Sequence, residues 1–138
     1  MDKKIFDDLV KSAILAREKS YSPYSNFAVG AALLCADGEI FTGANIESAT
    51  YTPTVCAERV AFSTAVHAGK KGFCAIAVVG GKADENISAY TPPCGVCRQF
   101  MAEFCSPDFT VILSNGKECK TMTLGELLPE SFTPSYLL

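Results

Sequence analysis

The chain has 138 residues and a mass of 14.7 kDa, which predicts one compact domain, residues 1–138, with a core of useful size. The net charge of −3, with Lys and Arg scattered along the chain, argues against long nucleic acids as partners. No apolar run approaches the length of a membrane helix, so we expect no membrane partner. The N-terminus is polar and lacks the apolar core of a signal peptide, so we expect the protein in a reducing cytoplasm. We therefore expect the seven cysteines not to form disulfides.

A helix is predicted over residues 3–20. Apolar residues recur there at helical spacing and form one stripe, which consists of Phe6, Leu9, Val10, Ala13 and Ile14. Proline and small polar residues in the next segment, 21–26, predict a turn. We interpret the helix as part of the scaffold.

A β-hairpin is predicted next. Two apolar runs, 27–35 and 40–44, are joined by Asp37-Gly38, and an Asp-Gly pair between apolar runs is a strong hairpin signal. Gly30 lies inside the first strand, where a glycine weakens the strand unless another backbone or a ligand approaches closely.

The rest of the chain alternates between predicted helices and strands. In order, we expect a polar loop (48–54), a helix (56–69), a strand (73–79), a loop (80–93), a helix (95–104), two strands (109–113 and 118–122), a short helix (123–128) and a tail (129–138). The two final strands meet at Asn115-Gly116 and predict a second hairpin. The resulting fold class is α/β, with a mixed five-stranded sheet and helices on its faces.

Three cysteines are placed at predicted helix starts. Cys94 and Cys97 form a C-x-x-C pair, which alone fits either half of a zinc site or a thiol redox pair. Cys56 begins the preceding helix and would complete a set of three thiolate ligands. The only histidine, His67, lies about three helical turns from Cys56, too far to share a metal ion. Three protein ligands and an open position for water are typical of catalytic zinc.

Two charged residues follow the first of these cysteines. Glu58 is two residues from Cys56 and could reach a water molecule on the metal, acting as general base and then as general acid. Three thiolates and Zn²⁺ sum to one negative charge, which makes the metal a weaker Lewis acid. We expect Arg59 and the two helix N-termini to compensate this charge. The other cysteines, Cys35, Cys74, Cys105 and Cys119, are interpreted as small buried hydrophobic residues.

The helix-start motifs, C-A-E at 56–58 and P-C-x-x-C at 93–97, resemble those of the zinc-dependent cytidine deaminases of the small, homotetrameric type. Other segments match the family in order between about residues 21 and 132: Y-S-N-F-A-V-G-A-A-L at 24–33, N-I-E at 45–47, R-Q at 98–99 and E-L-L-P at 126–129. The resemblance implies a three-layer αβα cytidine deaminase-like fold with an antiparallel final hairpin.

The resemblance also implies a reaction. Cytidine and deoxycytidine would be hydrolysed to uridine and deoxyuridine plus ammonia in pyrimidine salvage. Zinc-bound hydroxide would attack C4 while Glu58 shuttles the proton. One zinc ion per subunit would be held by Cys56, Cys94 and Cys97.

Substrate contacts follow from the same resemblance. Asn45 and Glu47 resemble the pair that binds the 3′-hydroxyl of the ribose, and Phe27 resembles a wall of the pyrimidine pocket. Ala57 is assigned to the substrate site as well. The resemblance also implies a homotetramer, because small members of the family form homotetramers in which neighbouring subunits complete each site. By that analogy Phe132 would stack on the base from across an interface, and Tyr51 would lie near a neighbour's site.

Three alternatives remain open at this point. The chain could deaminate another aminopyrimidine nucleoside, of the blasticidin type. A thiol redox protein would use Cys94 and Cys97 but would leave Cys56 and Glu58 unexplained. A zinc-stabilised interaction module would leave the open coordination position without a purpose. The Asn115-Gly116 hairpin and Cys56, where polynucleotide-editing relatives have histidine, favour a free nucleoside as substrate.

Overall fold

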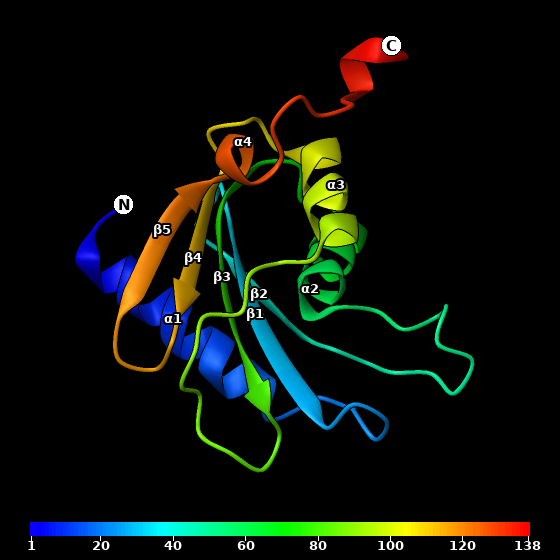
Figure 1. Cartoon of the computed structure of the whole chain (residues 1–138). Coiled ribbons are helices and arrows are strands. Elements are labelled where there is room, and N and C mark those ends of the chain that lie inside the picture. Colours follow the sequence, from blue (N-terminus) through cyan, green and yellow to red (C-terminus); the bar gives the residue numbers. More distant parts are fainter.

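A computed structural model describes all residues, 1–138, as one five-stranded sheet between two layers of helices (Figure 1). The strands are β1 (Phe27–Cys35), β2 (Ile40–Ala44), β3 (Phe73–Lys82), β4 (Thr110–Ser114) and β5 (Cys119–Thr123). Their order in the sheet is β2-β1-β3-β4-β5; β3 and β4 run parallel, and all other neighbours are antiparallel. The predicted mixed sheet and its final hairpin are therefore confirmed.

The helices cover both faces of this sheet. Helix α1 (Lys3–Arg17) lies on one face, and α2 (Ala57–His67) and α3 (Gly95–Phe104) lie on the other (Figure 1). Each face buries its own hydrophobic cluster, one around Leu9 of α1 and the larger one around Phe62 of α2. The short helix α4 (Leu124–Leu127) and a 3₁₀ turn (Pro134–Tyr136) complete the chain. The three-layer αβα arrangement is confirmed.

Two strand glycines let helices approach the sheet closely. A Cβ atom on Gly30 would lie 2.1 Å from the carbonyl oxygen of Ala13 in α1. One on Gly43 would lie 2.4 Å from the carbonyl oxygen of Ala57 in α2. Because no side chain fits at such distances, glycine is required where each helix crosses the hairpin.

The direction of the strands brings the candidate site residues to one end of the sheet. Strands β2 and β3 both run antiparallel to β1, so their carboxyl ends lie beside the start of β1. Helices α2 and α3 begin after β2 and β3, and their N-termini therefore lie at this same end. Ligand sites of α/β sheets form where strands end and helices begin. Phe27, Asn45, Cys56 and Cys94 are gathered there from four separate segments.

Some boundaries and burial assignments differ from the sequence predictions. Helix α1 ends at Arg17, about one turn early, and β3 continues past Val79 to Lys82 because its glycines pair with the start of β1. The burial of Cys35 is confirmed, but Cys105 is only half-buried. Cys74 and Cys119 are exposed, and their predicted burial was wrong. Cys119 begins the edge strand β5, whose first residues no helix covers, and Cys74 lies near the start of β3 where burial is incomplete.

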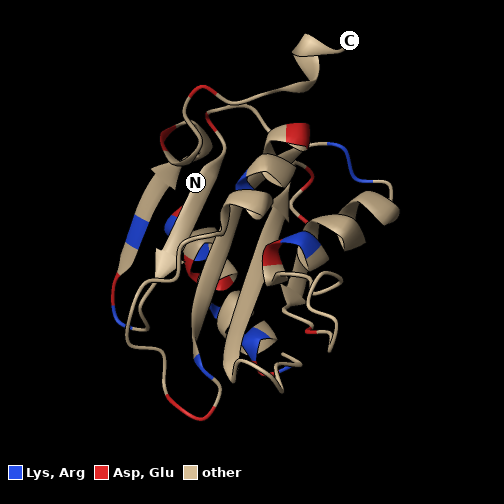
Figure 2. Ribbon diagram, turned by 45° about the vertical axis from the view of Figure 1, so that its right-hand side comes forward, with Lys and Arg blue, Asp and Glu red and all other residues tan.

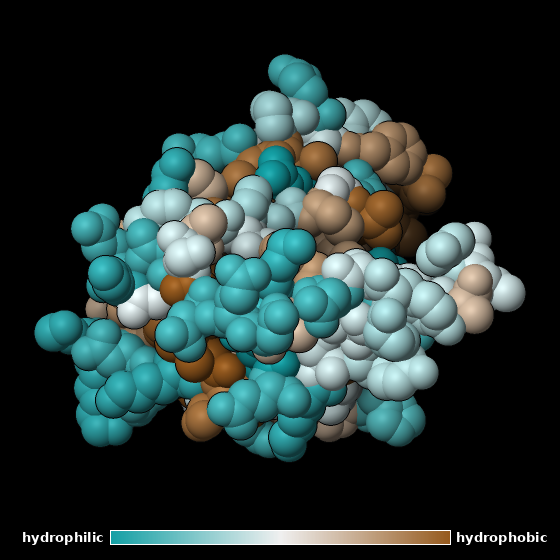
Figure 3. All heavy atoms as spheres, turned by 60° about the horizontal axis from the view of Figure 1, so that its bottom comes forward, coloured by the Kyte–Doolittle hydropathy of each residue, from teal (hydrophilic) through white to brown (hydrophobic).

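Charged residues are not confined to one part of the chain. Basic and acidic residues are both spread over helices, strands and loops (Figure 2). The face in Figure 3 is largely hydrophilic or of intermediate hydropathy, with separate hydrophobic patches between. None of the helices has the length and apolar character needed to cross a bilayer.

Candidate active site

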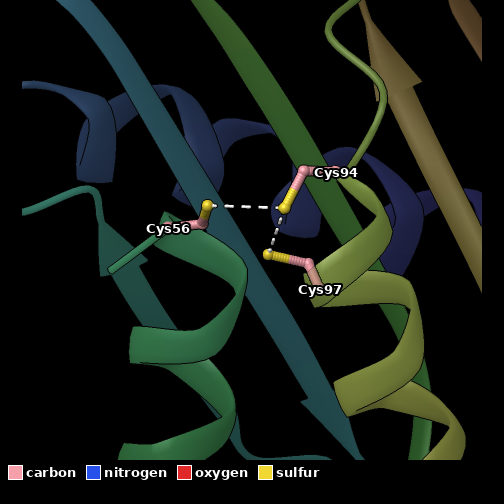
Figure 4. Close-up of side chains that lie close together, drawn as sticks. All are labelled: Cys56, Cys94 and Cys97. Atoms are coloured by element: carbon pink, nitrogen blue, oxygen red, sulfur yellow. Dashed lines mark hydrogen bonds between the residues drawn. The ribbon is translucent and has the colours of Figure 1, made fainter. Parts of the chain in front are cut away.

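Three thiols converge where α2 and α3 begin. Cys56 is the N-cap of α2, Cys94 is the N-cap of α3, and Cys97 lies in the first turn of α3 (Figure 4). The Sγ atom of Cys94 lies 3.7 Å from that of Cys56 and 3.4 Å from that of Cys97. All three sulfur atoms lie within 4.8 Å of one another, as the spacing of the motifs predicted.

This geometry fits a zinc ion. Tetrahedral zinc with Zn–S bonds of about 2.3 Å separates its sulfur ligands by about 3.8 Å, close to the two distances above. No histidine or carboxylate joins the three cysteines to close a fourth position. His67 lies in the last turn of α2, away from the cluster, as predicted. The donor set is therefore that of zinc with one open position.

Hydrogen bonds within the cluster shift the pKa values of two of the thiols in opposite directions. Hydrogen bonding with Cys97, supported by Arg59 and Cys94, lowers the pKa of Cys56 to about 5. The same contact, together with burial, raises the pKa of Cys97 above its usual range. Of these two thiols, Cys56 is the one that ionises first.

Glu58 is buried beside this cluster. Glu58 is only 3% exposed, and its Oε1 atom has no hydrogen-bond partner in the protein. Burial is the main reason that its pKa rises to about 7, and the charge of Cys56 adds to the effect. A carboxyl group with such a pKa can both accept and release a proton near neutral pH.

Arg59 supplies the positive charge at the cluster. Its Nη2 atom lies 3.6 Å from the sulfur of Cys56, at hydrogen-bond distance for a thiolate acceptor. Its Nε atom is buried without a partner. The guanidinium therefore faces the anionic ligand set.

A cavity of about 330 Å³ opens beside the thiols. Glu58, Cys56 and Cys94 contribute to its lining, and the rest comes from Ser25, Phe27, Val29, Asn45, Glu47, Thr54, Val55, Thr91 and Pro92. The predicted residues Phe27, Asn45 and Glu47 thus share one cavity with Cys56 and Cys94. Its size suits a small molecule rather than a polymer.

Asn45 and Glu47 are held in different ways. The Asn45 side-chain oxygen accepts from the backbone N–H of Val29 at 2.9 Å and from the hydroxyl of Ser20 at 2.6 Å. Its amide nitrogen donates one hydrogen to the carbonyl of Phe27 at 2.8 Å, which leaves one N–H free. The Glu47 carboxylate makes no ion pair, and hydrogen bonds from Ser25 and Tyr24 lower its pKa.

Three other predicted residues lie outside this cavity. Ala57 is fully buried at the start of α2, so only its backbone could meet a ligand. Tyr51 is 72% exposed and lines an adjoining cavity, where its ring lies edge-on to Tyr24. Phe132 is 57% exposed and stacks on Tyr136 in the tail. The chain's own fold therefore places neither Tyr51 nor Phe132 in the cavity beside the thiols.

Six lining residues had no predicted site role: Ser25, Val29, Thr54, Val55, Thr91 and Pro92. Ser25 lies within the quoted Y-S-N-F segment, and Thr91 precedes Pro92 and the first cysteine of the C-x-x-C pair. The only sequence signal for Ser25 and Thr91 was a short polar side chain next to a strand start or a ligand motif. Many ordinary turns have such a side chain, so the sequence could not distinguish a site residue from a turn residue.

The chain matches known proteins over most of its length. Residues 4–113 match the family model of the cytidine and deoxycytidylate deaminase zinc-binding region. The chain is 49% identical to a cytidine deaminase of Halalkalibacterium halodurans, with 91% of this chain and 92% of the relative covered. It is 38% identical to the blasticidin-S deaminase of Bacillus cereus, with 76% of each chain covered.

The comparison of structures agrees. The crystal structure of a cytidine deaminase from Burkholderia pseudomallei superposes with a TM-score of 0.84 and 42% identity, covering 96% of this chain and all of that one. The cysteine cluster, the sheet order and the extent of the matches lead to one assignment. The chain belongs to the family of zinc-binding cytidine and deoxycytidylate deaminases.

Proposed function

We propose that this protein hydrolyses cytidine and deoxycytidine to uridine and deoxyuridine, releasing ammonia. Residues 1–138 would form a single deaminase domain. The observation that carries the proposal is the buried carboxyl group of Glu58, which lacks a partner at Oε1 and lines the same cavity as Cys56 and Cys94. An acid–base group beside a metal-ligand cluster is what hydrolytic deamination requires.

Glu58 moves the protons in this proposal. Its carboxylate takes a proton from the attacking water and delivers it to N3 of the pyrimidine ring. It then transfers the second proton of that water to the amino group on C4, which leaves as ammonia. The pKa of about 7 suits both directions of transfer.

Cys56, Cys94 and Cys97 would hold one zinc ion per subunit. When bound, zinc lowers the pKa of a water molecule so that it becomes a nucleophile near neutral pH. Three thiolates weaken that effect, and Arg59, within 3.6 Å of Cys56, compensates part of their charge. The two helix N-termini contribute in the same sense.

The polar groups of the cavity suit a ribose hydroxyl. Asn45 has one free N–H and a side-chain oxygen that already accepts two hydrogen bonds, so it can only donate to a ligand. Glu47 is an unpaired carboxylate and can only accept. A hydroxyl group accepts one hydrogen bond and donates another, which satisfies both residues. We assign them to the 3′-hydroxyl, with Phe27 as a wall for the base.

The alternatives are less well supported. The cytidine deaminase of H. halodurans is more similar to this chain than the blasticidin-S deaminase is, both in identity and in coverage. A redox protein or a zinc module without turnover does not account for the family match over residues 4–113. Cytidine therefore remains the first substrate to test.

The setting of the enzyme is part of the proposal. We assign it to pyrimidine salvage in the cytoplasm, as a homotetramer. The exposed aromatic rings of Tyr51 and Phe132 support subunit contacts, because neither ring has a partner that buries it within the chain. Both residues would then approach a neighbour's site.

The direct test is an ammonia assay. The purified, zinc-loaded protein is incubated with cytidine, deoxycytidine and blasticidin S, and uridine and ammonia are quantified before and after treatment with a strong chelator. We expect equal amounts of uridine and ammonia from cytidine, loss of activity with chelator and recovery on adding zinc. Absence of turnover with both pyrimidine nucleosides would overturn the proposed function.

A further inference from the structure

The hydroxyl of Ser25 joins two residues that face the proposed substrate. It donates a hydrogen bond to Oε2 of Glu47 and accepts one from the backbone N–H of Phe27, at 3.0 Å. Ser25 itself lines the site cavity and the adjoining one. Its side chain therefore lies between the carboxylate assigned to the sugar and the residue assigned to the base.

The other hydrogen bonds from this turn reach only one carboxylate oxygen of Glu47, Oε1. Backbone N–H groups of Tyr24 and Ser25 donate to Oε1 at 3.0 and 3.1 Å. The Ser25 hydroxyl is the protein's donor to Oε2, since no other hydrogen bond and no ion pair reaches that atom. Without the hydroxyl, the carboxylate could pivot about its Oε1 contacts and lose its fixed orientation.

Ser25 is exposed, so its side chain contributes little to the core. The turn has its own support, because the N–H of Asn26 donates to the carbonyl of Ser22 at 3.0 Å. Replacing Ser25 by alanine would remove one hydroxyl without opening a buried cavity. A functional effect of this change can therefore be separated from a loss of folding.

We propose that Ser25 is a positioning residue, whose hydroxyl orients the Glu47 carboxylate toward the substrate sugar and couples it to the start of β1 at Phe27. The inference rests on the proposed function, because it takes Glu47 as the acceptor for a ribose hydroxyl. Preorganised acceptors lower the entropic cost of ordering the site when substrate binds. Ser25 thus acts on the substrate through Glu47 rather than by contact of its own.

The test compares Ser25→Ala with wild type on cytidine and on 3′-deoxycytidine. We expect kcat/KM for cytidine to fall roughly tenfold, the size expected for one hydrogen bond to a charged group. The loss should nearly vanish on 3′-deoxycytidine, because this substrate has no 3′-hydroxyl for Glu47 to bind. It should also nearly vanish in a Glu47→Ala background, because the carboxylate that Ser25 orients is then absent. Ser25→Thr keeps the hydroxyl and should remain close to wild type.

Ser22→Ala is the matched control, since it removes a hydroxyl from the same turn that contacts only Ser20. Equal losses on cytidine and 3′-deoxycytidine would overturn the proposal, and so would additive effects of Ser25→Ala and Glu47→Ala. Either result would mean that Ser25 acts on the fold or on another group.

A second measurement does not depend on turnover. Nuclear magnetic resonance titration of the Glu47 carboxyl carbon should give a lowered pKa in wild type, because the Ser25 hydroxyl is the largest stabilising contact of the charged form. We expect this pKa to rise in Ser25→Ala and to stay low in Ser22→Ala. An unchanged pKa in Ser25→Ala would overturn the inference, whereas an absence of cytidine turnover alongside the expected pKa change would overturn only the proposed function.

Discussion

The carboxyl group of Glu58 combines burial with a missing hydrogen-bond partner. A buried acid without a partner destabilises a folded protein, because its charged form is poorly solvated. Its location beside the cysteine cluster gives this arrangement a chemical use, since a substrate and a water molecule would supply the missing partners. The elevated pKa follows from the same burial.

Glu58→Gln tests this role while keeping the shape of the side chain. We expect the variant to fold and to retain zinc, because the three thiols are unchanged. Its kcat/KM for cytidine should fall roughly 10²- to 10⁴-fold, the contribution typical of general acid–base catalysis. Steady-state kinetics and a zinc assay on the same sample provide the measurement.

The control for this variant is Glu103→Gln, which makes the same change on the exposed side of α3. It should leave both zinc content and kinetics unchanged. Normal cytidine turnover by Glu58→Gln would contradict the proposed proton transfer.

The cysteine cluster makes a separate prediction. Cys94→Ala removes the thiol that lies within 3.7 Å of both other sulfur atoms. Bound zinc should fall from about one ion per chain to a small fraction, because two cysteines alone form an incomplete site. Metal analysis after dialysis measures the loss, with Cys74→Ala as the control because Cys74 is an exposed cysteine outside the cluster. Full zinc content in Cys94→Ala would show that the metal binds elsewhere.

At the level of elements, local signals determined what could be read from the sequence. Asp37-Gly38 predicted the first hairpin correctly, since Gly38 adopts a positive φ of 92° in the turn. The predicted short helix near residues 123–128 forms as α4, and a capping box between Thr123 and Glu126 begins it. The extension of β3 through Gly80 and Gly81 was missed, because only pairing with the distant strand β1 stabilises glycine there.

Gly30 shows how one such element contact can be tested. Gly30→Ala places a Cβ atom 2.1 Å from the carbonyl of Ala13 and 2.5 Å from the backbone nitrogen of Arg17. Helix α1 must shift, so the free energy of unfolding should fall by about 1–3 kcal/mol or more. Urea unfolding at fixed protein and zinc concentrations measures the change.

Gly95→Ala is the matched control, because a Cβ at Gly95 meets no atom within 4 Å. Its free energy of unfolding should change by less than about 1 kcal/mol, since alanine is tolerated in a helical turn. Equal stability of the two variants would contradict the close approach of α1 to β1.

Across the whole molecule, the site depends on contacts that join distant segments. The motifs predicted that Cys56 and Cys94 would meet, because both begin helices that follow strands of one sheet. The contact of Ser25 with Glu47 spans 22 residues and depends on the course of two irregular loops. Periodicity does not describe such loops, so this part of the site could not be predicted.

The C-terminal tail extends away from the sheet at the end of the molecule where α3 ends (Figure 1). Gln99 of α3 donates to the carbonyl of Phe132 at 2.8 Å, which anchors the tail while the phenyl ring stays exposed. Since Phe132 does not line the chain's own cavity, the proposed tetramer predicts that its ring acts on the site of a neighbouring subunit.

Mixed oligomers of two defective chains provide that test. Phe132→Ala should raise the KM for cytidine roughly two- to tenfold, the range expected for a lost aromatic contact, and Glu58→Ala should be inactive. When the two are co-expressed, a site with an intact Glu58 can receive Phe132 from its neighbour, so the KM of these sites should return toward the wild-type value. A Glu58→Ala/Phe132→Ala partner is the control, because it supplies no ring and should restore nothing. If purification through a different affinity tag on each chain yields mixed oligomers whose KM equals that of Phe132→Ala alone, Phe132 does not complete a neighbouring site, and its stacking on Tyr136 accounts for its position in the tail.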